Sequence, residues 1–223
     1  SEAVKDSDFN IFSGTVSRGG QVKGINFKGG ADSPRSTIDG FEEYVKMFRA
    51  KGLAWMALRE DELKSPIAKF LSEEEIEAIK EVMDAETGDL LLIVADKPAV
   101  VAAALGNLRL KIAEENNLIP EDVYEFVWIV DFPLFEYDED EDRLAALHHP
   151  FTAPIEADIE KLDTDPASVK SKAYDLVLNG EELGGGSIRI NNHKLQEKVF
   201  SALSISEEEQ QEKFGYLLEA FDY

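Results

Sequence analysis

The sequence predicts an α+β protein in which a mixed α/β unit precedes an antiparallel sheet with flanking helices. In the first half, short apolar runs typical of strands alternate with segments whose apolar residues have helical spacing. The second half contains several short strand-like segments and the dipeptide Asn179-Gly180, a strong signal for a hairpin turn. With 43% hydrophobic residues among 223, the chain can build the core of one large domain or of two ordinary ones.

Two strands and a helix are predicted at the start of the chain. Phe9–Val16 and Val22–Phe27 are interpreted as strands joined by the turn Arg18-Gly19-Gly20. Ile38–Ala50 carries apolar residues at helical spacing and stops at Gly52, a usual end signal for a helix.

The remainder of the first half predicts two more strands and two more helices. We expect Leu53–Leu58 to be a short apolar strand and Glu73–Met83 to be helical. Leu90–Ala95 is a continuous apolar run of strand length, so this strand should be buried on both faces. Lys97–Asn117 then predicts a long helix, and the first domain is expected to comprise residues 1–118.

Residues 119–223 form the second predicted domain, which is rich in strands and then becomes helical. Ser72–Glu77 and Ser206–Glu212 each begin Ser-Glu-Glu-Glu, which is typical of a helix start, because carboxylates meet the positive end of the helix. Glu156–Asp165 is interpreted as a helix or a loop. The other predicted elements of the second domain are the strands Phe126–Phe132, Arg143–Leu147, Ala173–Leu178 and Gly184–Ile190, an acidic turn at Asp138–Asp142, and the helices His193–Leu203 and Glu207–Phe221.

The composition argues against several classes of function. The net charge of −23 comes from 46 acidic and 23 basic residues, and such a surface repels phosphate backbones. A free-standing nucleic-acid-binding module is therefore disfavoured. There are no cysteines, which excludes disulfides and thiolate zinc sites and suits a reducing cytoplasm. No run of about eighteen apolar residues occurs, so no membrane span is expected.

Two segments of the second half combine aromatic or basic residues with proline. Val130–Glu136 (VDFPLFE) is interpreted as a strand running into a proline-fixed bend, with its aromatic residues in the core. His148 and His149 are two of only three histidines, and the prolines at 150 and 154 constrain where their loop points them. Adjacent residues on a strand face opposite ways, so such a pair rarely binds one metal. A role in ligand binding or proton transfer remains open beside a purely structural loop.

The third segment, Asp175–Ile190, is unusually dense in glycine. Three consecutive glycines, Gly184–Gly186, lose much conformational entropy when they form a strand. Such a run is tolerated where another molecule approaches the backbone closely. Asp175 and Glu182, on paired strands, can both reach one divalent ion, and Arg189 offers a planar fork suited to a carboxylate. The segment lacks the spacing of either glycine-rich phosphate loop. The alternatives are a β-bulge and a flexible hairpin with no ligand.

Together these segments resemble the bacterial-type aspartyl-tRNA synthetases, which are class II enzymes. The resemblance runs through DFPLFE, HHPFTAP, AYDLVLNGEELGGGSIRI and KFGYLLEAFDY, in the order of the family. In the first half, FNIFSGTVSRGGQVKGINFKGG, AKGLAWMAL, SPIAKFLSEEE and GDLLLIVADKPAVVAAALGNLR resemble the GAD-type domain inserted into that family's catalytic region. A related domain is found in a subunit of the glutamyl-tRNA amidotransferase. The resemblance implies an inserted domain in residues 1–118 and part of a class II catalytic domain in residues 119–223.

The resemblance implies catalytic and ATP-binding roles for four residues. The histidine that matches His148 lies against bound aspartate and the reacting α-phosphate region in the family, and the one that matches His149 lies close by. Both are therefore expected to be catalytic. The acids that match Asp175 and Glu182 hold Mg²⁺ on ATP, so a metal and ATP site is expected here.

Four further residues are implied to bind the amino-acid substrate. The arginine that matches Arg189 pairs with the side-chain carboxylate of aspartate and so selects the amino acid. The strand that matches Gly184, Gly185 and Gly186 forms part of the floor beneath the substrate.

The resemblance also implies a reaction and its partners. Aspartate is activated with ATP and transferred to tRNA by a cytoplasmic enzyme that is a homodimer and has no membrane association. We expect this chain alone to be inactive and its incomplete sheet to expose apolar surface, because the family's anticodon-binding barrel, dimer motif and further ATP-binding motifs have no counterpart in it. The alternative is a free-standing module, derived from the synthetase, that binds tRNA or an amidotransferase.

Overall fold

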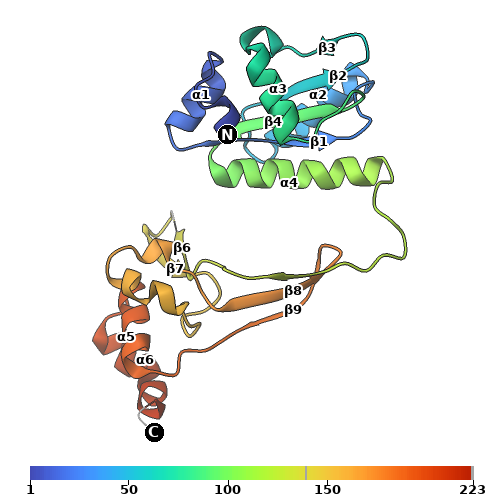
Figure 1. The fold of residues 1–223 in the computed structure, drawn as a ribbon. Coiled ribbons are helices and arrows are strands. Elements are labelled where there is room, and N and C mark those ends of the chain that lie inside the picture. Colours follow the sequence, from blue (N-terminus) through green and yellow to red (C-terminus); the bar gives the residue numbers. More distant parts are fainter. Residues whose placement is uncertain (139, 222–223) are drawn as a thin grey trace. The chain divides into compact units, whose positions relative to one another are not determined.

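The computed structural model describes residues 1–138 and 140–221. These residues divide into two compact units, which separate between residues 121 and 122 (Figure 1). Glu139 of the predicted acidic turn and the final residues Asp222 and Tyr223 lie outside the described residues. Both units combine helices with antiparallel sheets, which confirms the α+β class. The domain boundary after residue 118 stays a prediction.

A four-stranded antiparallel sheet forms the centre of the first unit. Its strands are β1 (Gln21–Phe27), β2 (Ala54–Leu58), β3 (Leu63–Lys64) and β4 (Leu90–Asp96), in the order β1-β4-β2-β3. As its continuous apolar sequence predicts, β4 is buried on both faces, because successive side chains point to opposite sides of the sheet.

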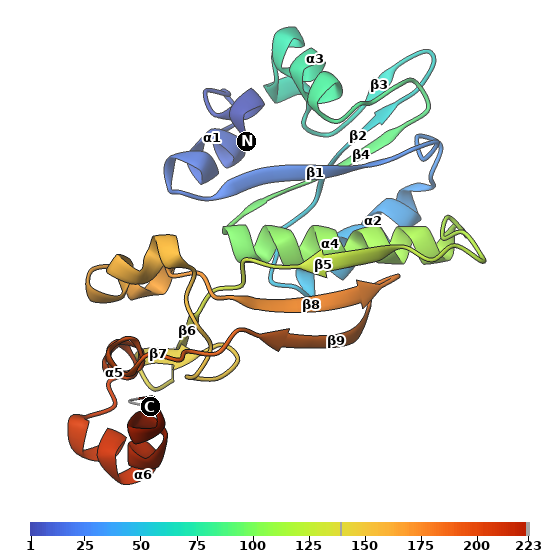
Figure 2. The ribbon, with the colours of Figure 1, turned by 60° about the horizontal axis from the view of Figure 1, so that its bottom comes forward.

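Helices cover both faces of this sheet (Figure 2). On one face, α2 (Arg35–Lys46) and α4 (Pro98–Glu115) pack against alternate residues of β4, including Leu90 and Leu92. On the other face lie α1 (Asn10–Ser17), α3 (Glu73–Val82) and a 3-10 helix at Glu2–Val4, which share a second core with the intervening residues of β4 and with β2. The first unit therefore has three layers and two cores. Over the residues that the structure describes, no helix is long and apolar enough to cross a membrane.

The predicted strand Phe9–Val16 is wrong, because this segment is the helix α1. Its apolar residues Phe9, Phe12 and Val16 recur at three and four positions, which also fits a helix, and Phe12 is buried against the sheet while Phe9 and Val16 pack beside it. Gly19 then has a φ of +79°, a conformation that favours glycine just beyond a helix end. The Gly-Gly pair therefore links a helix to β1 and does not form a hairpin.

Both acidic Ser-Glu-Glu-Glu segments begin helices, as predicted. Ser72 caps α3 and Ser206 caps α6 (Glu207–Ala220), each with its side chain accepting from the backbone N–H three residues on. The side chains of Glu75 and Glu209 in turn accept a hydrogen bond from the backbone N–H of the cap residue, which completes a capping box.

The second unit contains two small antiparallel sheets. Asn179 and Gly180 have φ values of +50° and +91° and form the predicted hairpin turn, since this turn needs positive φ at both positions. The hairpin extends to one side of the C-terminal helices (Figure 1). The three-stranded sheet has the order β5 (Phe126–Ile129), β8 (Ala173–Leu178), β9 (Glu181–Ser187), and the two-stranded sheet pairs β6 (Phe135–Asp138) with β7 (Arg143–Ala146).

The boundaries of two predicted strands in this unit are wrong. The strand predicted at Phe126–Phe132 stops at Ile129, because Asp131 has a φ of +61°, which a strand does not accommodate. The strand predicted at Gly184–Ile190 is β9, which begins at Glu181 directly after the hairpin turn and ends at Ser187. The segment predicted as a helix or a loop is a 3-10 helix at Glu156–Asp163.

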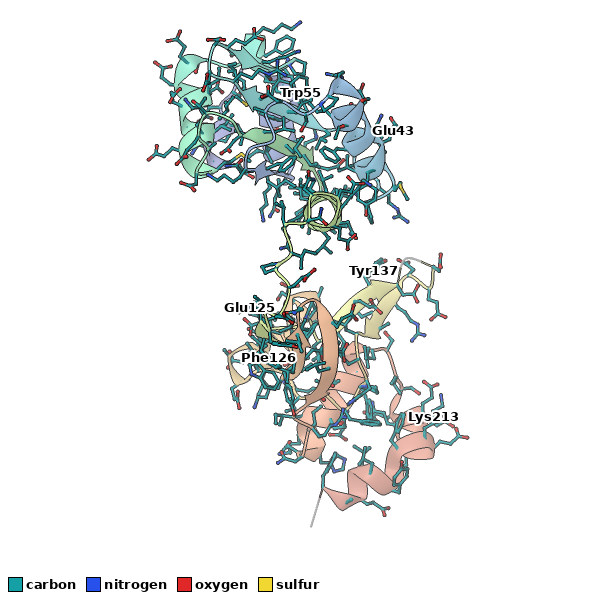
Figure 3. All side chains as sticks on the ribbon, turned by 90° about the vertical axis from the view of Figure 1, so that its right-hand side faces the viewer. Glu43, Trp55, Glu125, Phe126, Tyr137 and Lys213 are labelled. Atoms are coloured by element: carbon teal, nitrogen blue, oxygen red, sulfur yellow. The ribbon has the colours of Figure 1, made fainter. Side chains whose placement is uncertain are left out.

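The core of the second unit lies between the two-stranded sheet, the 3-10 helix and α5 (His193–Ala202). It leaves most of the three-stranded sheet uncovered. Phe126, labelled in Figure 3, is 61% exposed and Trp128 is 59% exposed. This exposed apolar surface agrees with the expectation from the sequence. The buried hydrophobic residues of this core are Leu134, Phe135, Ala153, Leu162, Val169, Ile190, Val199 and Leu203.

Candidate active site

The predicted site residues lie on one hairpin and on one loop of the second unit. Asp175 is on β8, and Glu182 and the glycines are on β9. Arg189 follows β9 by two residues. His148 and His149 occupy the loop that follows β7. The structure thus joins the second and third segments that the sequence singles out.

Arg189 and His149 are in direct contact, although 40 positions separate them. The Nη1 atom of Arg189 lies 2.9 Å from Nδ1 of His149. A guanidinium group can only donate, so His149 Nδ1 must be the acceptor. The backbone N–H of Phe151 donates to the same nitrogen at 3.2 Å. Two donors on Nδ1 assign His149 as the neutral tautomer that carries its proton on Nε2.

The charge state of His149 follows from its surroundings. Burial lowers the pKa of His149, and the positive charge of Arg189 and then His148 lower it further. The lowered pKa favours the neutral form of His149, in agreement with the two donors on Nδ1. This arrangement suits an acceptor that orients a guanidinium group, and it does not provide a proton donor on the Arg189 side.

Backbone hydrogen bonds attach the histidine loop to the end of β9. Thr152 and Arg189 form an isolated antiparallel bridge. The N–H of Ile190 donates to the carbonyl of Phe151 at 2.9 Å, and the N–H of Ala153 donates to the carbonyl of Ile188 at 2.9 Å. The position of Arg189 relative to the loop is therefore set by sheet-like pairing and not by flexible side chains alone.

The two C-terminal helices hold the same loop from the core side. The ring of Phe151 meets those of Phe200 on α5 and Phe214 on α6 edge-on, at 6.1 and 5.6 Å between centroids. Gln196 on α5 donates from Nε2 to the carbonyl of Pro150 at 2.8 Å. The sequence analysis missed Gln196. Its signal was a polar residue at helical spacing from Val199, Phe200 and Leu203, on the apolar side of α5.

Asp175 and Glu182 lie on one face of the sheet because of a β-bulge. Asp175 pairs with Gly185, and after the irregularity at Leu176/Val177, Val177 pairs with Glu182. Val177 lies two positions from Asp175 and so shares its face, which places Glu182 diagonally across from Asp175. Without the extra residue in β9, Glu182 would point to the opposite face.

This pair of carboxylates fits the chemistry of Mg²⁺, which is commonly held by one or two carboxylates together with substrate phosphates. Glycine at position 185 leaves the space that the Asp175 carboxylate occupies, because a Cβ there would overlap Asp175 Oδ1. Over the described part of the chain, no cluster of three or more acidic or histidine residues is arranged to hold a metal by itself. A metal held here thus needs further oxygen ligands, from water or from a substrate.

The three glycines have different surroundings. A Cβ at Gly186 would lie 3.0 Å from the hydroxyl of Tyr174, so the chain's own side chains fill the space beside Gly185 and Gly186. Gly184 has open space where a Cβ would be. The β-bulge that the sequence left as an alternative is present. Gly185 also has a structural role, because a side chain there would overlap the Asp175 carboxylate. A role in binding substrate stays a prediction for all three.

His148 lies apart from this network and contacts the first segment. Its ring is edge-on to that of Phe132, with 5.0 Å between the centroids, and the residue is exposed. Next to Phe132, Asp131 accepts from Lys170 at 2.9 Å. Adjacent histidines thus face different environments, as expected for neighbours in an extended segment.

Arg189, Asp175 and Glu182 keep their charges uncompensated. Within residues 1–138 and 140–221, none of the three forms an ion pair. Most lysines of this unit do pair with carboxylates, including Lys170 with Asp131 and Lys172 with Glu156. One arginine and two carboxylates are therefore free to bind ligands of opposite charge.

Comparison with known proteins confirms the resemblance that the motifs predict. Residues 12–105 match the family model of the GAD domain. The whole chain is 71% identical to a stretch of an aspartate–tRNA(Asp/Asn) ligase of Halothermothrix orenii, covering 38% of that protein. It is 57% identical to part of an aspartate–tRNA ligase of Clostridium botulinum, and 56% identical to part of an aspartate–tRNA(Asp/Asn) ligase of Anoxybacillus flavithermus. The chain spans 37% and 38% of these two relatives.

Proposed function

We propose that this chain is part of an aspartate–tRNA ligase that activates aspartate with ATP and transfers it to tRNA. The observation that carries the proposal is the Arg189 guanidinium, which is held by the neutral His149 and has no ion-paired carboxylate among the described residues. The similarity over the full chain to ligases named for aspartate supports the same substrate.

Arg189 is proposed to bind the side-chain carboxylate of aspartate. Since His149 occupies Nη1, the other N–H groups of the guanidinium remain for a planar, two-point contact with a carboxylate. His149 cannot compete for this role, because it is neutral and accepts a hydrogen bond from the same arginine. Selection of aspartate over asparagine follows, since a neutral amide offers one acceptor and no charge to the guanidinium.

Asp175 and Glu182 are proposed to bind ATP through Mg²⁺. A bound Mg²⁺ would neutralise charge on the phosphates. The two carboxylates would hold it on the face that also carries Gly185. The α-carboxylate of aspartate then attacks the α-phosphate of ATP and gives aspartyl-adenylate and pyrophosphate. The acyl group passes from the adenylate to the terminal ribose of tRNA, and AMP is released. In this proposal the chain contributes mainly position and charge. His148 is proposed to lie beside the reacting groups.

The chain alone is proposed to be inactive, because Arg189 binds aspartate and the two carboxylates, acting through Mg²⁺, are too few groups to hold three phosphates. The whole ligase is proposed to be a cytoplasmic homodimer. The net charge of this chain is −23, so the tRNA is proposed to bind to other, more basic surfaces of the ligase.

Aspartate-dependent ATP–pyrophosphate exchange tests the proposal, with the whole ligase and this chain measured side by side. We expect exchange in the whole ligase only, and a loss of about 10²-fold or more in kcat/KM for Arg189→Met. Arg143→Met is the control, because Arg143 lies on β7 and pairs only with Glu141 among the described residues. Exchange with another amino acid in place of aspartate, or full activity of Arg189→Met, would refute the proposal.

A further inference from the structure

We propose that Gln196 is a positioning residue for amino-acid selection: it holds the Pro150–Phe151 peptide so that His149 stays in the tautomer that accepts from Arg189. The contacts that carry this inference are independent of the ligase reaction, and only the consequence for aspartate rests on the proposed function. No contact between Gln196 and a substrate is implied.

Gln196 is a polar residue inside an apolar core. Its side chain is fully buried on α5, among apolar residues of the second unit's core. Its Nε2 donates to the carbonyl of Pro150, and its Oε1 is buried without a hydrogen-bond partner within the described residues. A buried amide with an unpaired oxygen is costly, so an apolar residue would suit this position better if packing were the only requirement. Among the described residues, the amide therefore contributes one thing that an apolar side chain would not: its hydrogen bond to the carbonyl of Pro150.

One peptide group connects the contact of Gln196 with that of His149. The carbonyl of Pro150 and the N–H of Phe151 belong to the same planar trans peptide, so they point in opposite directions. When Gln196 fixes the carbonyl toward α5, it also fixes the N–H away from α5. That N–H meets His149 Nδ1 at 3.2 Å.

The same peptide group is linked to Arg189 through His149. A donor on Nδ1 requires that this nitrogen carries no proton, which leaves its lone pair facing Arg189 Nη1 as well. If the peptide rotated, Nδ1 could be protonated and would then present an N–H to a group that can only donate. Arg189 would lose its acceptor and with it one fixed orientation. Gln196, Pro150, Phe151 and His149 therefore form a chain of contacts that ends on the arginine.

The packing of the loop is a separate contribution from that of the amide. Phe151 is held by rings of Phe200 and Phe214, and these contacts would persist if Gln196 were replaced by an apolar residue. Removal of the amide should consequently leave the loop folded, while the peptide group between Pro150 and Phe151 is no longer held in one orientation. This separation makes the inference testable.

The first test measures the histidine tautomers in this chain by long-range ¹H–¹⁵N NMR. The chain has three histidines, so His148→Gln and His149→Gln variants assign the signals. Gln196→Met removes the donor at similar volume. The matched control is Gln210→Met, because Gln210 is also a buried amide, on α6, whose Nε2 donates to the carbonyl of Ile205 at 2.9 Å.

We expect the parent chain and Gln210→Met to show His149 with its proton on Nε2. Gln196→Met should show a mixture of tautomers and a pKa of His149 closer to that of a free histidine. An unchanged His149 in a folded Gln196→Met variant would overturn the proposal. If that variant does not fold, Gln196→Glu serves instead. Its protonated acid can still donate to Pro150 and its ionised form cannot, so the tautomer ratio should change with the ionisation of Glu, and a constant ratio would overturn the proposal.

The second test uses the whole ligase and separates this inference from the proposed function. For Gln196→Met, KM for aspartate should rise about tenfold while KM for ATP stays unchanged, and Gln210→Met should change neither. A whole ligase that shows no exchange with aspartate would refute the proposed function and leave the NMR result standing. A mixture of His149 tautomers in Gln196→Met together with an unchanged KM for aspartate would instead overturn the link from Gln196 to amino-acid selection.

Discussion

Gly185 on β9 lies directly across from Asp175 on β8, and the absence of a side chain at Gly185 leaves the space that the Asp175 carboxylate occupies. A methyl group at position 185 would overlap Asp175 Oδ1, so the carboxylate would have to move. The orientation of one proposed Mg²⁺ ligand is therefore set by a glycine on the neighbouring strand.

Gly185→Ala should reduce ATP–pyrophosphate exchange of the whole ligase by about 10²-fold, because small displacements of a positioned ligand have effects of this size. The loss should be partly overcome by high Mg²⁺ concentration, since the carboxylate is displaced and not removed. Gly184→Ala is the matched control. A Cβ at Gly184 has open space, so its activity should stay close to that of the parent. Equal losses in both variants would contradict this account.

Arg189→Met should raise the pKa of His149 in this chain. The lowered pKa comes from burial and then from the charge of Arg189, and the substitution removes that charge. NMR titration of the histidine Cε1–H signals measures the shift, with Arg143→Met as a control that leaves His149 unaffected. In the parent chain, stability linked to His149 should be present above its unfolded-state pKa of about 6.5 and should be lost as the pH falls through the lowered folded value. A pKa that is the same with and without Arg189 would show that the two groups do not interact.

Asp89→Asn should destabilise the first unit by about 1–3 kcal/mol. Asp89 is buried and accepts hydrogen bonds from the backbone N–H groups of Gly29 and Glu86 and from Asn26, at 3.0 Å each. An amide at this position would direct its NH₂ toward one of these donors. Urea unfolding measures the change through the fluorescence of the buried Trp55, in a Trp128→Phe background.

The Asp89→Asn difference should depend on pH. Burial raises the pKa of Asp89, but the hydrogen bonds from Glu86, Asn26 and Gly29 outweigh burial and leave the pKa below its ordinary value. The stabilisation is thus complete above about pH 4 and is lost as the pH falls through the lowered folded pKa. Asp84→Asn is the control, because the Asp84 side chain is 94% exposed and should contribute within about 0.5 kcal/mol. A pH-independent difference would exclude the carboxylate's charge as the cause.

Ser206→Ala should destabilise the second unit by about 1 kcal/mol, because it removes the capping box of α6. Hydrogen exchange should accelerate in the first turn of α6 and also around Phe151, whose ring contacts Phe214 on this helix. Ser72→Ala is the matched variant, since Ser72 has the same capping box on α3 in the first unit. Its effect should stay within residues 1–121. Exchange that accelerates throughout the chain in both variants would contradict this separation.

The exposed sheet of the second unit should make this chain self-associate in high salt. Apolar residues of β5 are exposed, among them Phe126 and Trp128, while the net charge of −23 opposes association. Salt screens the repulsion over about 10 Å at 0.1 M and about 3 Å at 1 M, so the sedimentation coefficient should rise with salt concentration. Trp128→Lys should reduce this rise, and Tyr216→Lys, which changes an exposed residue on α6, should not.

Much of the fold is encoded in short stretches of sequence. The apolar run of β4, the turn at Asn179-Gly180 and the two Ser-Glu-Glu-Glu helix starts were each predicted, because burial on both faces, positive φ and capping depend on a few neighbouring residues. The strand predicted for α1 failed because the spacing of its apolar residues was misjudged. Phe9, Phe12 and Val16 are three and four positions apart, which fits a helix and not the alternation of a strand, and Phe12 is buried against the sheet.

The sequence by itself determined the chemical groups of the candidate site and the family that they resemble, because residue types and their order along the chain carry that information. Only the tertiary structure decided how those groups meet. The contact of His149 with Arg189, the shared face of Asp175 and Glu182, and the hold of Gln196 on Pro150 depend on pairing between distant segments and on one extra residue in β9. Periodicity along a chain reports which face is buried, whereas the partner across a contact is fixed only when the segments pack.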